Sequence, residues 1–350
     1  MSLTKLDIDR FISTLRTKSK EFNSITNVQL ASMLEETISN INEVAYFWAT
    51  ICSDNKGTTK TPAEGEEWVG GPYAAVLATQ YYRDTLIDDS DLNEDKYNEK
   101  ENSYSVFPNN LIERISFPFV NAKVLFNKSM SFDDINKYRG FSKRYDIDPS
   151  ITLVLGAGNY SSIPYLDVMY HLVTRRSVIL LKLNPVNEYL KPVFEKVFQN
   201  FIERGYIIVT TGNVDESKYM TKHPGINHIH LTGSDKTYED IVYGRELSDN
   251  DRKLKQLRKI NNKPITSELG NVTPIIIHPG NWSTSDIKYQ ARKIVTGKLN
   301  NNGFNCISAQ VVVLPDGWGH TDTLIKYIKH YMNKIKDRKA YYPDSIDRLK

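Results

Sequence analysis

Apolar residues recur at helical spacing through the first 55 residues of the chain. One such face is marked by Leu30, Met33, Leu34, Ile38 and Ile41. Positions three and four apart lie on the same side of a helix, so this spacing predicts helix. A turn-rich segment follows at 55–62, a further helix is expected from Tyr73 to Leu86, and the acidic, polar stretch 90–102 is expected to form an exposed loop.

The middle of the chain has a different rhythm, in which short apolar runs alternate with helical stretches. Strands are expected at Ile151–Leu155, Ser177–Leu183, Ile207–Thr210, His228–Leu231 and Pro274–His278. A helix is expected between the second and third of these, from about Glu188 to Arg204. Strands that alternate with helices join by right-handed crossovers into a parallel sheet covered on both faces. The pattern therefore predicts an α/β fold with a largely parallel sheet.

Composition is ordinary for a soluble globular protein and excludes several classes of partner. Of the 350 residues, 40% are hydrophobic and 25% charged, and 45 basic residues nearly balance 42 acidic ones. Such a balance builds no large field of one sign, so we expect no nucleic-acid partner. The charged N-terminus lacks the apolar core of a secretory signal, and no apolar run is long enough to span a bilayer. We expect a cytoplasmic protein of about two domains.

Three segments end apolar runs with residues able to bind an anion or a nucleotide. Gly156-Ala-Gly158 precedes Asn159, whose side-chain amide can donate to a developing oxyanion. Lys182 ends the next run, at the edge where open α/β sheets bind ligands, and can reach a phosphate or a ribose. The turn Thr232-Gly233-Ser234 can present free N–H groups to a pyrophosphate. Taken singly, each has a plain alternative: a tight turn, a solvated lysine, a strand terminus.

Two further residues have side chains suited to chemistry. Glu268 is expected to act as a general base if an apolar pocket raises its pKa, and a surface carboxylate is the alternative. Cys306 follows an Asn-rich turn that can expose its sulfur, and the apolar run Val311–Leu314 comes soon after. It is either a buried hydrophobe or a nucleophile that reacts as its thiolate. With Cys52 as the only other cysteine, we expect no disulfide framework and no metal site.

In their order along the chain, these segments resemble the motifs of the aldehyde dehydrogenase superfamily. Glu268-Leu-Gly-Asn271 is similar to the usual Glu-Leu-Gly-Gly, and Asn301-Asn-Gly-Phe-Asn-Cys306 is similar to Asn-x-Gly-Gln-x-Cys. Leu231-Thr-Gly-Ser234 resembles Phe-Thr-Gly-Ser, Asn159 resembles the start of the Asn-Phe-Pro loop, and Leu181-Lys-Leu resembles the Leu-Lys-Pro strand end. Each match is short. Their order and spacing make the resemblance specific, over about residues 150–315.

The resemblance implies oxidation of a small-molecule aldehyde to a carboxylic acid with NAD or NADP. The Cys306 thiolate would attack the carbonyl, and the Asn159 amide and the Cys306 N–H would stabilise the resulting oxyanion. Hydride transfer to the nicotinamide would leave a thioester, which water activated by Glu268 would hydrolyse. Lys182 would hold the adenosine ribose, and Gly233 and Ser234 would approach the pyrophosphate.

The implied organisation is a helical N-terminal region with a Rossmann-like NAD(P)-binding domain in residues 1–267. Residues 268–350 would form part of an α/β catalytic domain. Only residues 307–350 follow Cys306, whereas the family has a much longer catalytic domain and an oligomerising strand after its nucleophile. We therefore expect a truncated gene product, a split gene product or a fragment, and a homo-oligomer stays open.

Departures from the family pattern leave the cofactor and the reaction open. Phe304 stands in place of the usual glutamine, and Asn271 in place of the second glycine. After Lys182 the chain reads Leu-Asn-Pro185 instead of Pro-x-Glu, so the carboxylate that would bind an NAD ribose is absent there. One alternative is an acyl-CoA or acyl-phosphate reductase of the same superfamily, which coenzyme A dependence would identify. The other is a catalytically inactive remnant that still binds a nucleotide or a partner.

Overall fold

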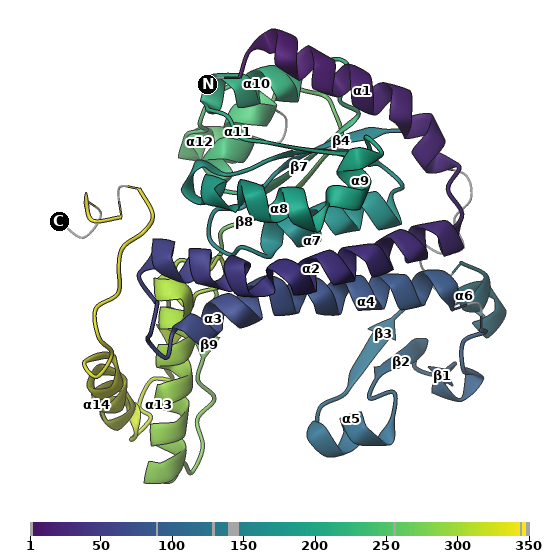
Figure 1. Cartoon of the computed structure of the whole chain (residues 1–350). Helices are drawn as coiled ribbons and strands as arrows, with labels where there is room; N and C mark the ends of the chain where they lie inside the picture. Colours follow the sequence, from purple (N-terminus) through teal and green to yellow (C-terminus); the bar gives the residue numbers. More distant parts are fainter. Residues whose placement is uncertain are drawn as a thin grey trace.

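A parallel β-sheet lies at the centre of the molecule, with helices on both faces (Figure 1). The structure is a computed structural model that describes residues 3–88, 90–127, 130–138, 147–254, 257–343 and 345–347. The five strands have the order β6-β5-β4-β7-β8. Their bounds are β4 (Ile151–Leu155), β5 (Val178–Lys182), β6 (Ile207–Thr210), β7 (His228–Gly233) and β8 (Ile265–Leu269). Every residue of β4 and β5 is buried, which explains their continuous apolar sequences.

The order of the strands reverses between β4 and β7. From β4 the chain moves outward through β5 to β6, then returns to the other side of β4 for β7 and β8. Ligands of open α/β sheets bind in the crevice at such a reversal, beyond the carboxyl ends of the strands. The loops after β4 and β7 therefore face one another across the position where a ligand is expected.

The N-terminal helices pack on and beneath this sheet. Helix α1 (Lys5–Asn23) contacts β4, β5 and β6, while α2 (Asn27–Lys56) packs against α4 (Ala74–Ile87) and α8 (Lys191–Val197). Each of the first two helices is preceded by an N-cap threonine, Thr4 or Thr26. The side chain of this threonine accepts a hydrogen bond from the backbone N–H three residues further along the chain. Gly57, at φ 68°, ends α2 in a left-handed conformation that suits glycine.

Helices connect the parallel strands on both faces. On the side of α2 lie α7 (Ile163–Met169), the π-helix η3 (Tyr170–Thr174), the 3-10 helix η4 (Pro185–Leu190), α8 and α9 (Gln199–Glu203). On the side of α1 lie α10 (Val214–Lys222), α11 (Asp235–Tyr243) and α12 (Asp249–Arg252) (Figure 1). Between α2 and α4 the chain forms α3 (Glu64–Trp68) and the π-helix η1 (Val69–Tyr73). No helix of the described ranges is both long and apolar enough to cross a membrane.

A small antiparallel sheet lies apart from the parallel one, on the far side of α4 (Figure 1). It consists of β1 (Tyr97–Asn98), β2 (Ser103–Phe107) and β3 (Ala122–Leu125). The 3-10 helix η2 (Glu94–Lys96) precedes it, α5 (Leu111–Ser116) connects β2 to β3, and α6 (Phe132–Tyr138) follows.

The C-terminal part of the chain has a hydrophobic cluster of its own. Strands β9 (Ile275–Ile276) and β10 (Val312–Val313) form a parallel pair, and the other elements are α13 (Thr284–Leu299), the 3-10 helix η5 (Asn300–Gly303) and α14 (Thr321–Met332). The cluster is made by Ile277, Ile287, Ala291, Ile294 and Leu324. The boundary expected between residues 267 and 268 falls inside β8, and the assignment of cofactor and catalytic domains stays a prediction.

Most of the expected elements are present, two local expectations differ from the structure, and one strand was not expected. The segment Pro274–His278 contributes only β9, outside the main sheet, and Ile276 is 74% exposed, so this is not a buried strand. The stretch expected to be an exposed loop at 90–102 is exposed or half-buried throughout, as expected, but it contains η2 and β1. The sequence pattern also missed β8, whose three central residues Thr266, Ser267 and Glu268 are exposed and carry no apolar signal.

Candidate active site

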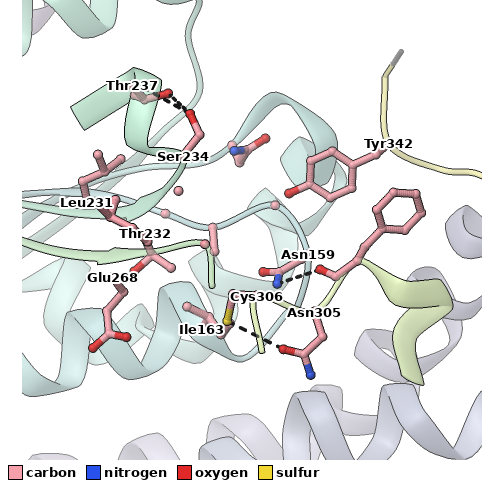
Figure 2. A pocket seen from close by; sticks show the side chains of 18 of the residues that line it. Asn159, Ile163, Leu231, Thr232, Ser234, Thr237, Glu268, Asn305, Cys306 and Tyr342 are labelled. Carbon is pink, nitrogen blue, oxygen red and sulfur yellow. Dashed lines mark hydrogen bonds between the residues drawn. The ribbon is translucent and has the colours of Figure 1, made fainter. Parts of the chain in front are cut away.

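All six predicted site residues line one cavity of about 2110 Å³ at the carboxyl ends of the parallel strands. They are Asn159, Lys182, Gly233, Ser234, Glu268 and Cys306. Figure 2 shows part of this cavity, with Cys306 close to Asn159 and Ile163. Ordinary small-ligand pockets measure roughly 300–1,000 Å³. This one therefore has room for an extended ligand.

Cys306 is presented to the cavity by a tight turn. Asn301, Asn302 and Gly303 have φ values of 50°, 54° and 76°, a left-handed run that asparagine and glycine tolerate better than other residues. The Cys306 side chain is exposed, and its sulfur lies 3.6 Å from Asn305 Oδ1. Its carbonyl oxygen accepts from the Asn271 N–H at 3.1 Å, which ties the turn to the segment after β8. The alternative of a buried hydrophobic cysteine is therefore wrong for Cys306.

The other cysteine has the opposite environment. Cys52 is fully buried in α2, and burial raises the pKa of its thiol to about 12. A thiol with a raised pKa holds little thiolate at neutral pH, which is the nucleophilic form. Of the two thiols, Cys306 is the one accessible to a ligand.

Asn159 is hydrogen-bonded to the turn that carries Cys306. Its side-chain Nδ2 donates to the Phe304 carbonyl oxygen at 3.0 Å (Figure 2). An amide NH₂ group has two protons, so one remains available to a bound oxyanion. The Asn159 carbonyl oxygen accepts from Lys56 Nζ at 3.0 Å, Asn301 Nδ2 at 3.1 Å and the Tyr341 hydroxyl at 3.2 Å. Both ends of this residue are therefore fixed.

Glu268 lines the cavity but does not approach the thiol. It lies on β8 opposite Thr232 of β7, and its side chain is exposed. Figure 2 shows its carboxylate directed away from Cys306. Of the two alternatives for Glu268, its exposure matches the surface carboxylate and not a residue enclosed in an apolar pocket. For Glu268 to act on a group bound to Cys306, its side chain must rotate.

Lys182 is buried at the end of β5, with 6% of its surface exposed. The alternative of a solvated strand-end lysine is therefore wrong. Within the described ranges its ammonium forms no hydrogen bond or ion pair, although it lines the cavity. Burial lowers the pKa of Lys182, and the nearby carboxylates of Glu188 and Glu216 oppose this shift. A buried cation without a partner is suited to bind a polar or anionic ligand group.

Gly233 and Ser234 lie where β7 leads into α11. The Ser234 hydroxyl accepts from the Thr237 N–H at 3.1 Å and so caps the helix. The N-terminus of a helix has unsatisfied N–H groups and a positive dipole end, both of which favour an anion. Gly158, on the loop across the cavity, is closely packed, because a Cβ there would lie 2.7 Å from the Tyr342 hydroxyl and would force a neighbouring side chain to move.

Comparisons with known proteins agree with this geometry. The model of the aldehyde dehydrogenase family matches residues 169–344, half of the chain. The chain belongs to the aldehyde dehydrogenase family. It is 23% identical over 183 residues to the N-succinylglutamate 5-semialdehyde dehydrogenase of Sphingopyxis alaskensis, a match that covers 52% of this chain and 34% of that protein.

Solved aldehyde dehydrogenase structures show the same fold at low identity. The NADP-dependent glyceraldehyde-3-phosphate dehydrogenase of Bacillus halodurans, complexed with NADP, is 16% identical, with a TM-score of 0.63. That match covers 96% of this chain and 58% of the other. A point mutant of betaine aldehyde dehydrogenase from Staphylococcus aureus, in complex with NAD⁺, is 15% identical over 96% of this chain and 56% of that one, with a TM-score of 0.62. The chain thus spans little more than half the length of these relatives.

The aromatic side chain at Phe304 explains one departure from the family motif. Its ring packs against Tyr341 at 4.9 Å and Tyr342 at 5.2 Å between centroids. A glutamine at this position would lose both aromatic contacts. Phe304 therefore joins the turn before Cys306 to the segment after α14.

The cavity fits a dinucleotide such as those used by the family. The unpaired ammonium of Lys182 and the α11 N-terminus beyond Ser234 offer two separate polar positions along it. The carboxylate of the family motif is absent directly after Lys182 in the sequence, and the carboxylates of Glu188 and Glu216 are near enough to raise the pKa of Lys182 against the effect of burial. Among the described residues, no group of three or more His, Cys, Asp or Glu side chains is arranged to hold a metal ion.

No sequence motif pointed to Lys56 and Glu67, which lie directly behind the site. Lys56 Nζ bonds the Glu67 carboxylate, the Asn159 carbonyl and Asn301 Oδ1. Glu67 lies in the acidic segment Glu64-Gly-Glu-Glu67. No periodicity or motif links it to a lysine at the end of the preceding helix.

Proposed function

We propose that the protein oxidises an aldehyde to a carboxylic acid with NAD or NADP, through a covalent intermediate on Cys306. One observation carries the proposal. The exposed Cys306 thiol, the fixed Asn159 amide and the buried Lys182 side chain line the same cavity, in a chain of the aldehyde dehydrogenase family. Membership of the family supports aldehyde oxidation in general, and the residue roles are our assignment.

The first step is attack of the Cys306 thiolate on the aldehyde carbonyl carbon. A new sulfur–carbon bond forms, and the carbonyl oxygen becomes an oxyanion. The remaining N–H of the Asn159 amide and the Cys306 backbone N–H, which donates no other backbone hydrogen bond in the described ranges, stabilise this charge. Removal of one such donor typically slows a reaction by about 10²–10³-fold.

NAD or NADP, when bound, supplies the hydride acceptor. Lys182 would hold its ribose or phosphate groups, and Gly233 and Ser234 would bring the N-terminus of α11 to its pyrophosphate. Collapse of the oxyanion re-forms the carbonyl bond, breaks the carbon–hydrogen bond with loss of hydride to the acceptor, and leaves a thioester on Cys306. Glu268, after rotation toward Cys306, accepts a proton from the water that releases the acid and restores the thiolate.

A direct assay tests this proposal. The purified chain is mixed with NAD or NADP and a panel of aldehydes, and reduced cofactor is followed by its absorbance. The Cys306→Ala variant is expected to produce none. The Cys52→Ala variant, which removes the buried thiol, is the matched control and is expected to keep the activity. Equal activity of the wild type and Cys306→Ala would exclude the covalent mechanism.

The direction of Glu268 supports a second candidate, in which the thioester is formed from or passed to a thiol such as coenzyme A. A carboxylate turned away from Cys306 does not activate water there, so acyl transfer to another nucleophile becomes competitive. Reduction of an acyl-CoA to an aldehyde with consumption of reduced cofactor would favour this candidate. Oxidation of aldehydes without coenzyme A would favour the first.

A further inference from the structure

A buried ion pair lies behind the loops that carry Asn159 and Cys306. Lys56, at the end of α2, and Glu67, in α3, are 4% and 3% exposed. Lys56 Nζ lies 3.0 and 2.9 Å from the two carboxylate oxygens of Glu67. Neither residue lines the cavity. The pair therefore acts on a ligand only through the residues that it holds.

The pair is bonded to both loops of the site. Lys56 Nζ also donates to the Asn159 carbonyl oxygen at 3.0 Å and to Asn301 Oδ1 at 3.1 Å. Asn301 Nδ2 in turn donates to the same Asn159 carbonyl at 3.1 Å, and the single proton of the Tyr341 hydroxyl lies within reach of both the Asn159 carbonyl oxygen and Asn301 Oδ1. One ammonium thus joins helix α2 to the loop after β4 and to the turn before Cys306.

The Asn301 turn needs such an anchor. Asn301 has a left-handed backbone conformation, which is less favourable for asparagine than the right-handed helical or extended conformations. Such a conformation persists where contacts with the surrounding structure stabilise it. Asn301 is 3% exposed and also donates its backbone N–H to Glu66 Oε2 at 3.0 Å. Every polar group of its side chain is bonded within this network.

A buried ion pair is a poor source of stability, because desolvation of the two charges offsets their attraction. Replacing such a pair by apolar side chains is often neutral for the fold. Here the charges are also opposite and adjacent, so their combined field at the cavity is small. The pair differs from an ordinary buried ion pair because Lys56 also donates hydrogen bonds to oxygens of Asn159 and Asn301, which lie on separate segments of the chain.

We infer that Lys56 and Glu67 are positioning residues that hold the Asn159 amide in register with the Cys306 thiol. This inference rests on the proposed function, because it assigns Asn159 as the oxyanion donor. A displacement of about 1 Å between reacting groups can cost on the order of 10²-fold in rate. Loss of the pair should therefore slow a step that forms an oxyanion and spare one that does not.

Two reactions of Cys306 separate these steps without any cofactor. With p-nitrophenyl acetate, sulfur bonds to the carbonyl carbon, an oxyanion forms, and p-nitrophenolate leaves as the thioester is made. With iodoacetamide, sulfur displaces iodide directly and no oxyanion forms. The ratio of acylation to alkylation rate therefore measures oxyanion stabilisation, while thiolate content and access affect both rates. Reaction of Cys306 is followed by mass spectrometry, with Cys306→Ala as the background.

The test compares four variants with the wild type. Asn159→Ala, which removes the donor itself, should lower the ratio by about 10²-fold or more. The double variant Lys56→Met with Glu67→Leu should lower it by about 10-fold or more, with little change in alkylation. Lys56→Arg keeps the charge pair and should lie nearer the wild type than the double variant does. Should the double variant fail to fold, Tyr341→Phe removes one donor to Asn159 and should lower the ratio by about 3-fold.

The matched control is the surface ion pair of Lys196 with Glu43 on α2, at 2.9 Å. Its double variant, Lys196→Met with Glu43→Leu, should leave the ratio unchanged. If Asn159→Ala lowers the ratio and loss of Lys56 and Glu67 does not, the positioning role is wrong and the proposed function stands. If Asn159→Ala leaves the ratio unchanged, the assignment of the oxyanion donor is itself wrong, and the inference is wrong with it.

Discussion

His171 provides a quantitative prediction about acid stability. It lies in η3 behind β7, is 1% exposed, and neither ring nitrogen has a hydrogen-bond partner among the described residues. The ring centroid of His230 lies 4.9 Å away. Burial, followed by the nearby His230 and Arg175, lowers the pKa of His171 from 6.5 to about 3. The folded protein therefore keeps this ring neutral across the mildly acidic range.

The sign follows from proton binding. Between pH 6.5 and pH 3 the unfolded chain binds a proton at His171 that the folded protein does not, so the free energy of unfolding falls as the pH falls. One pKa unit corresponds to about 1.4 kcal/mol, and pH 5 lies roughly 1.5 units below the unfolded value. His171 alone should therefore lower the free energy of unfolding by about 2 kcal/mol between pH 7 and pH 5.

The His171→Phe variant tests this figure, because it keeps an aromatic ring and removes the titration. Urea unfolding at pH 7 and pH 5 gives the loss of stability for each protein. The wild type should lose about 2 kcal/mol more than the variant over this interval. The same substitution at exposed His278 is the control and should not change the loss. Equal losses in the wild type and His171→Phe would refute the reasoning, since the other titrating groups are common to both.

Three further predictions concern the site and the second hydrophobic cluster. Asn159→Ala should slow formation of reduced cofactor by about 10²–10³-fold at an unchanged unfolding midpoint, and an unchanged rate would exclude Asn159 as the oxyanion donor. Lys182→Met should raise the dissociation constant of NADPH, measured by fluorescence titration, by roughly 10–150-fold, which corresponds to one charged hydrogen bond. Lys123→Met, at an exposed lysine that is paired with Glu101 and does not line the cavity, is its control, and equal affinities of the wild type and Lys182→Met would remove Lys182 from the cofactor site. Leu324→Ala, at a fully buried position of α14, should lower the free energy of unfolding by about 2–5 kcal/mol in chemical denaturation, and a loss below about 1 kcal/mol would contradict the packing of this cluster.

The fold was predictable where a buried strand has an uninterrupted run of apolar residues in the sequence. Strands β4 and β6 begin and end at the expected residues, and β5 and β7 differ from expectation by one or two. Strand β8 carries no such signal, because it lies at the edge of the sheet with Thr266, Ser267 and Glu268 exposed. The small antiparallel sheet was missed for the same reason, since all four residues of β3 are exposed.

The candidate site was predictable as a set of residues but not as an arrangement. Motif order selected Asn159, Lys182 and Cys306, and each had a plain alternative that the sequence left open. The burial of Lys182 excluded a solvated strand-end lysine, and the exposure of Cys306 excluded a buried hydrophobic cysteine. Neither could be known from the sequence, because burial and exposure depend on which distant segments cover each residue. The direction of Glu268 is a matter of side-chain conformation at a sheet edge, which the motif around it does not specify.

The sequence by itself determined the alternation of strands and helices and the family motifs. Through the motif around Cys306 it also indicated which of the two cysteines is the candidate nucleophile. These depend on neighbours within a few residues, where periodicity and turn chemistry act. Only the tertiary structure decided that Lys56 meets Asn301, 245 positions later, and that both bond the Asn159 loop. Such a contact forms because packing of α2 against the sheet brings distant segments together and leaves their buried polar groups no partners but one another.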